Sequence, residues 1–325
     1  MTDRTSPRWL RMLGYAGFFG LCFVISLYLT FPMSAIKPRV VDMLQKAVQQ
    51  AGPQPGRYGT QAEVQIERVD IYRLTGLELT RLSVRLATTE PDPGPTWEFD
   101  RARARLQLLP LILGHQRVGF DVDLYDGNLS GSALVVDQNL AELDAELEGV
   151  AVGKVPVVLA ALGVPLEGLI GGTVDLKLGK DPKEAKGTIV LQGQGHVLGP
   201  GEFKIPGLTG GLTVPAIDLG VLDVQVEVAD GKARVKPAGL KGKDVEVASD
   251  LTLTLRSPLG RSTAAGALEF RLAEAFLKAN EKFQPILDFT PQLKRAKDKD
   301  GSYHFKLAGS LASLRPVPDP KAKVN

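Results

Sequence analysis

Apolar residues along the chain follow three patterns, and each pattern predicts a different structure. From Met12 to Met33 the sequence is unbroken by Asp, Glu, Lys, Arg or His. From residue 34 to residue 51 apolar residues recur at helical spacing, and over most of residues 57–314 they alternate with polar ones. The sequence therefore predicts a membrane-spanning helix, a short amphipathic helix and a β-rich domain, in that order.

The first pattern is long enough to cross a bilayer. The 22 residues from Met12 to Met33 rise about 33 Å as a helix, against a hydrocarbon core of about 30 Å. A secretory signal peptide has a shorter apolar core of about 7–15 residues and a small-residue cleavage site. This stretch ends in bulky residues instead, which favours an uncleaved transmembrane helix at residues 12–33.

Flanking charge predicts the orientation of this helix. Arg4, Arg8 and Arg11 precede it, whereas Lys37 and Arg39 follow it. A short tail with the larger positive charge stays in the cytoplasm. We therefore expect a single-pass protein with residues 1–11 in the cytoplasm and the remainder in the periplasm or otherwise outside the cytoplasm.

The second pattern predicts a helix beside the membrane. Ile36, Val40, Val41, Leu44 and Val48 recur at helical spacing, and a Gly- and Pro-rich break ends the pattern at residues 52–56. Two interpretations are open. The helix either docks onto the β-rich domain or lies on the lipid surface with its apolar side inward.

The third pattern predicts many short strands. Leu222, Val224, Val226 and Val228 alternate with polar residues, and Asp126-Gly127 and Asp230-Gly231 are typical hairpin turns. Alternation slips once near Arg68 and once between Leu79 and Leu82. The pattern also predicts strands at 140–148 and 303–311, helices at 155–162 and 272–283, a charged loop at 294–300 and a disordered tail at 315–325.

These elements define the expected fold class. The chain is predicted to be mainly β, with an N-terminal transmembrane helix followed by a curved, partly open antiparallel β-sheet at residues 57–314. Helices at 155–162 and 272–283 are too few to cover a sheet of this length. The sole cysteine, Cys22, lies in the predicted membrane helix, so the β-rich domain has no disulfide.

Composition and motifs argue against catalysis and against nucleic-acid binding. The net charge is +2, which gives no general attraction to nucleic acid. His115, His196 and His304 lack partners at metal-ligand spacing, and no nucleophile motif is present. We expect no catalytic, metal-binding or cofactor-binding residues, and therefore no enzyme.

One charged stripe is a weak candidate for an interaction site. Arg101, Arg103 and Arg105 alternate with apolar residues and would share one face of a strand. The simpler interpretation is a solvated outer face. The alternative is a basic stripe that faces lipid headgroups or an acidic partner.

The order of features resembles a known family, the type II secretion system protein N family (general secretion pathway protein N). The membrane helix ends in Leu29-Thr30-Phe31-Pro32 and precedes the short helix. The other segments that carry the likeness are Val69-Asp70-Ile71-Tyr72-Arg73-Leu74-Thr75-Gly76-Leu77, Phe99-Asp100-Arg101-Ala102-Arg103-Ala104, Pro165-Leu166-Glu167-Gly168-Leu169-Ile170-Gly171-Gly172 and Lys241-Gly242-Lys243-Asp244-Val245.

The resemblance implies an accessory or scaffold component of type II protein secretion, anchored in the bacterial inner membrane. Its partners would be the bilayer and other inner-membrane or periplasmic components of that system. The repeated β pairs also resemble the AsmA-like group, whose curved sheets offer an apolar groove to lipids. That likeness implies a second hypothesis, a lipid-binding or lipid-transfer protein of the cell envelope that holds phospholipid.

Overall fold

The computed structural model describes residues 33–50 and most of residues 58–324, together with Phe18 and Phe19. Within 58–324 the residues not described are 74, 89–95, 113, 137–138, 157, 159–163, 180, 204–211, 257–261, 282, 285–286, 288–289 and 311–313. The predicted membrane helix therefore lies outside the described residues except for Phe18, Phe19 and Met33. Within the described part of the chain, no helix is long and apolar enough to cross a membrane.

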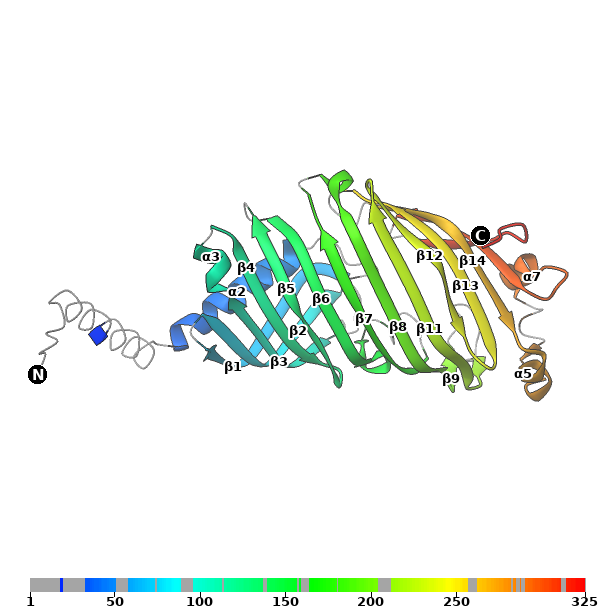
Figure 1. Cartoon of the computed structure of the whole chain (residues 1–325). Coiled ribbons are helices and arrows are strands. Elements are labelled where there is room, and N and C mark those ends of the chain that lie inside the picture. The colour runs from blue at the N-terminus through cyan, green and yellow to red at the C-terminus, as the bar shows by residue number, and fades with distance from the viewer. Residues whose placement is uncertain are drawn as a thin grey trace, which may run out of the picture.

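Fourteen antiparallel strands form one open sheet, in which neighbours in space follow one another along the chain (Figure 1). The first eight are β1 Tyr58–Tyr72, β2 Gly76–Thr88, β3 Thr96–Leu106, β4 Gln116–Leu124, β5 Gly127–Val136, β6 Asn139–Ala151, β7 Leu166–Lys177 and β8 Lys186–Leu198. The other six are β11 Ile217–Ala229, β12 Lys232–Lys241, β13 Val245–Thr254, β14 Thr263–Leu272, β15 Tyr303–Ser310 and β16 Arg315–Pro318. Between β8 and β11 in the sequence, β9 Gly201–Phe203 and β10 Leu212–Val214 form a separate two-stranded sheet. The prediction of a mainly β, antiparallel and open domain is confirmed.

Strand pairing sorts the side chains into an apolar face and a polar face. One row of paired residues crosses the sheet from β1 to β15 and contains only apolar residues and glycine: Ile71, Leu77, Ala104, Phe120, Gly131, Ala145, Val174, Ile189, Val226, Val235, Leu251, Gly266 and Leu307. The adjacent row from β2 to β7 is mostly polar: Glu78, Arg103, Asp121, Ser130, Glu146 and Thr173. Because side chains alternate along a strand, these two rows lie on opposite faces.

The two slips in alternation fall opposite each other. Ile66 pairs with Leu82 and Arg68 with Thr80, so Glu67 and Arg81 meet at the point of irregularity. Arg81 has φ of 48° there, and its Nε lies 2.9 Å from a carboxylate oxygen of Glu67. Since both strands slip at the same place, their apolar residues stay on one face.

Four buried clusters lie around the margins of the apolar face. Helix α2, Met33–Gln50, packs against β1 and β2 at the N-terminal end of the sheet, which confirms the predicted helix at 34–51. Ala296, Tyr303 and Phe305 form a cluster at the C-terminal end. The other two clusters centre on Phe276 and on Val228.

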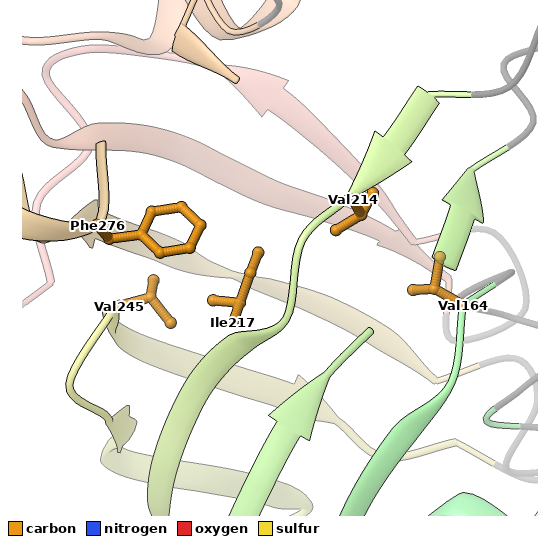
Figure 2. Close-up of a cluster of buried hydrophobic side chains, with 5 residues drawn as sticks. All are labelled: Val164, Val214, Ile217, Val245 and Phe276. Carbon is orange, nitrogen blue, oxygen red and sulfur yellow. The ribbon is translucent and has the colours of Figure 1, made fainter. Parts of the chain in front are cut away.

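Figure 2 shows the largest of these clusters. Phe276 comes from helix α5, Glu274–Ala279, and faces Val245 and Ile217, with Val214 and Val164 beside them. All five side chains are buried. The cluster ties α5 and the β9/β10 pair to the lower part of the sheet in Figure 1.

Several local predictions need correction. The tail at 315–325 is not wholly disordered, because β16 pairs with β15 through backbone hydrogen bonds. The helix predicted at 272–283 begins only at Glu274, since Leu272 is still paired with Val245. Part of the loop predicted at 294–300 is helical, because α7, Pro291–Ala296, begins with a proline that suits the first turn. The helix predicted at 155–162 lies mostly outside the described residues.

Both predicted hairpins are confirmed, but the turn predicted at Asp126-Gly127 lies one residue earlier. Tyr125 and Asp126 join β4 to β5, and Asp230 and Gly231 join β11 to β12, in each case with positive φ at both residues. This backbone conformation matches the right-handed twist of the flanking strands. The turn chemistry therefore determines the pairing of these strands locally.

Candidate functional site

The centre of the apolar face carries apolar side chains that are only half-buried. They come from β4 to β8 and β11 and belong to none of the four buried clusters. We call this set the central apolar strip: Val118, Phe120, Val122, Leu124, Leu129, Ala133, Leu143, Ala145, Leu147, Val174, Ile189, Leu191, Leu222 and Val224. Large contiguous apolar surfaces of this kind mark binding sites for apolar partners.

Glycine lets the strip present a smooth surface. A Cβ on Gly131 would lie 2.8 Å from the Phe120 ring and 2.2 Å from the carbonyl oxygen of Asp144. Only glycine fits this close approach, so the Phe120 ring lies directly over the β5 backbone. The strip therefore offers aliphatic groups and one ring, and the row through Phe120 contributes no polar side chain between β1 and β15.

The strip is long enough for an extended hydrocarbon chain. Its six neighbouring strands, spaced at about 4.8 Å, span about 24 Å across the sheet. One leaflet of a bilayer has a hydrocarbon thickness of about 15 Å, half of the full core. A lipid acyl chain could lie across the strands over its whole length.

Helix α2 covers the apolar face on the N-terminal side of the strip. Val40, Val41 and Leu44 of α2 cover the apolar face of β1 and β2. The Lys37 ammonium also donates a hydrogen bond of 3.0 Å to the carbonyl oxygen of Glu67. Helix α2 is therefore docked onto the β-rich domain, as the first of the two interpretations predicted.

The predicted arginine stripe lies on the polar face, where neighbouring strands neutralise most of it. Arg103 Nε lies 2.7 Å from a carboxylate oxygen of Glu78 on β2, and Arg101 Nε lies 2.8 Å from Asp123 on β4. The hydrogen bond to Glu78 raises the pKa of Arg103. Arg105 makes no ion pair within the described part of the chain. Arg101 and Arg103 are therefore engaged by carboxylates within the polar face.

Asp123 has a pKa below its ordinary value, chiefly because Asn128 donates a hydrogen bond of 3.0 Å to it and secondarily because Arg101 does so. This lowered pKa stabilises the folded state at pH values above the ordinary carboxyl pKa. The stabilisation is lost as the pH falls through the lowered pKa of Asp123.

Removing the amide of Asn128, which donates the hydrogen bond to Asp123, tests the cause of the lowered pKa. In Asn128→Ala we expect the Asp123 pKa to rise toward its ordinary value, measured by a pH titration of the ¹³C carboxyl signal. Ser130→Ala, on the same strand and face, serves as the control and should leave this pKa unchanged. An unaltered Asp123 titration in Asn128→Ala would contradict the assignment of Asn128 as the main donor.

Sequence reasoning missed a second surface, which lies on the polar face near one end of β7, β8 and β11. Leu169 and Val221 are 44% and 56% exposed there. Two adjoining depressions of about 670 Å³ and 510 Å³ share Leu169 and Gln194. Glycines at 149, 153, 168, 171, 193 and 195 line them. No local pattern marks this place, because the pairing of β7, β8 and β11 brings Leu169 and Val221 together.

The histidines form no shared site. His115 is exposed, whereas His196 and His304 are buried on different strands. His196 Nδ1 lies 3.0 Å from the carbonyl oxygen of Gly220. In the parts of the chain described above, no group of three potential ligands surrounds a metal position.

Comparisons with models of protein families, with curated proteins and with solved structures find no match.

Proposed function

We propose that this chain is a membrane-anchored lipid-binding protein of the bacterial cell envelope. The observation that carries the proposal is the central apolar strip, a half-exposed apolar surface that runs across six strands. The strip would hold the acyl chains of a phospholipid while the headgroup stays in water. The predicted membrane helix at 12–33 would keep the strip close to the inner membrane on its periplasmic side.

The chemistry of the strip suits hydrocarbon rather than a peptide. A bound peptide needs partners for its backbone N–H and C=O groups, whereas the central part of an antiparallel sheet has already used its own in strand pairing. An acyl chain has no such requirement. Each buried CH₂ contributes about 0.8 kcal/mol, part of which is lost in ordering the chain.

The absence of polar groups along the row through Phe120 also predicts the type of selectivity. A surface of aliphatic groups does not distinguish one headgroup from another. We therefore expect the strip to accept phospholipids of different headgroups, with selectivity for acyl-chain length rather than for charge.

Site-specific photo-cross-linking in the full chain tests the proposal. Benzoylphenylalanine in place of Phe120 points into the strip, whereas the same group in place of Ser130 lies on the polar face of the next strand. In native membranes labelled with ³²P-phosphate, we expect a phospholipid adduct from position 120 and little from position 130. Equal adducts at both positions, or none at position 120, would contradict lipid binding by the strip.

The resemblance to type II secretion protein N supports a second proposal, that the chain is an accessory scaffold of type II secretion. The observation in its favour is the exposed pair Leu169 and Val221 beside two depressions on the polar face, a surface suited to a protein partner. Cross-linking from position 169 in intact cells to other components of the secretion system tests this role. Adducts with unrelated proteins alone would count against it.

A further inference from the structure

Two exposed leucines lie in the connection between β3 and β4, where these two strands end and begin. Residues 108–113 read LLPLIL, and Leu108 to Ile112 form the short helix α3, drawn beside β4 in Figure 1. Leu108 is 51% exposed and Leu111 is 42% exposed. Large apolar side chains exposed close together are unfavourable in water and call for a functional explanation.

Other exposed apolar residues lie at the same end of the neighbouring strands. Leu106 ends β3, and Val136 and Leu140 flank the connection between β5 and β6. Their exposed fractions are 40%, 39% and 39%. Val136 follows Val135 on β5 and therefore points to the polar face. Leu106, Leu108, Leu111 and Leu140 form a surface that we call the leucine rim.

The leucine rim continues into the central apolar strip. Leu106 pairs with Val118, and Leu140 pairs with Val135, so both lie on the apolar face. Leu143 of the strip follows Leu140 on β6. Apolar residues therefore continue from the ends of β3 and β6 to the middle of the apolar face.

Unpaired positive charge lies beside the rim. Arg105 directly precedes Leu106 at the end of β3, points to the polar face and makes no ion pair in the described part of the chain. Arg73 is exposed, and its guanidinium carbon lies 5.3 Å from the centre of the Tyr72 ring. Nearby carboxylates are already paired, Glu78 with Arg103 and Glu142 with Arg117.

We propose that the leucine rim docks onto the surface of a phospholipid bilayer. The leucines would enter the region between headgroups and acyl chains, while Arg73 and Arg105 contact lipid phosphates. Exposed leucines beside unpaired arginines match this environment, which is apolar below and anionic above. The proposal stands without lipid on the central strip, although the continuity of the two surfaces would let an acyl chain pass from one to the other.

Depth measurements in the full chain test the proposal. In a Cys22→Ser background, Leu111→Cys carries an environment-sensitive fluorophore, and the protein is reconstituted in vesicles of phosphatidylethanolamine and phosphatidylglycerol. The matched control is Val221→Cys, which is also exposed but lies on the polar face of β11. Lipids with nitroxide-labelled acyl chains should quench the label at 111 at least about threefold more than the label at 221.

A second variant tests the charge separately. Arg73→Gln combined with Arg105→Gln should reduce quenching at 111 in vesicles that contain phosphatidylglycerol, and should change it little in pure phosphatidylcholine. Equal quenching at 111 and 221 would overturn the proposal. Burial of the label at 111 without lipid, dependent on protein concentration, would also overturn it, because the rim would then contact a second copy. Neither result depends on the adduct at position 120, so the two proposals can fail independently.

Discussion

Aspartate in place of Val174 is expected to lower phospholipid cross-linking from position 120 by about tenfold or more. Val174 lies in the middle of the central apolar strip, in the same row of paired residues as Phe120 and three strands away from it. A carboxylate there must lose water when hydrocarbon covers it, which costs several kcal/mol, and about 1.4 kcal/mol already amounts to a tenfold change. The measurement is the yield of ³²P adduct in the full chain.

Thr173→Asp is the matched control for this experiment. Thr173 precedes Val174 on β7, is exposed and lies on the polar face. The same charge on the same strand should leave the adduct within about twofold of the original, because surface substitutions disturb a fold little. Far-ultraviolet circular dichroism checks that both variants keep their β-structure. An equal loss in both variants would show that the charge acts through the fold and not through the strip.

Alanine in place of Phe276 is expected to lower the free energy of unfolding by about 3–5 kcal/mol. Phe276 is 5% exposed and meets the Phe283 ring edge to face at a centroid distance of 5.9 Å. Its removal leaves a cavity among Val164, Ile217 and Val245, which come from segments far apart in the chain (Figure 2). The neighbours cannot close this cavity without moving several strands.

Urea unfolding of the full chain in detergent micelles, followed by circular dichroism, measures this effect. Val317→Ala provides the control, because Val317 is 54% exposed on the last strand and should cost less than about 0.5 kcal/mol. A loss below about 1 kcal/mol for Phe276→Ala would show that this cluster contributes little to the stability of the sheet.

Local pattern predicted most of the strands and two of their connections. The dipeptides Asp126-Gly127 and Asp230-Gly231 predicted two hairpins, although the first turn lies one residue earlier, with positive φ at Tyr125 and Asp126. Alternation likewise assigned Arg101, Arg103 and Arg105 to one face of β3. The pattern failed where the outcome depends on distant contacts, as at Arg315–Pro318, which becomes a strand only because β15 offers an edge.

The sequence by itself determined a mainly β chain with one apolar and one polar face, because the two-residue period of a strand is a local property. Only the tertiary structure decided which neighbours each face meets. Pairing of β2, β3 and β4 brings Glu78 to Arg103 and Asp123 to Arg101. Leu108 and Leu111 are exposed because α3 lies in the connection between β3 and β4. Helix α2 and the three other clusters cover the margins of the apolar face and leave its centre half-exposed. The covering of a face depends on packing between distant segments, which no local pattern contains.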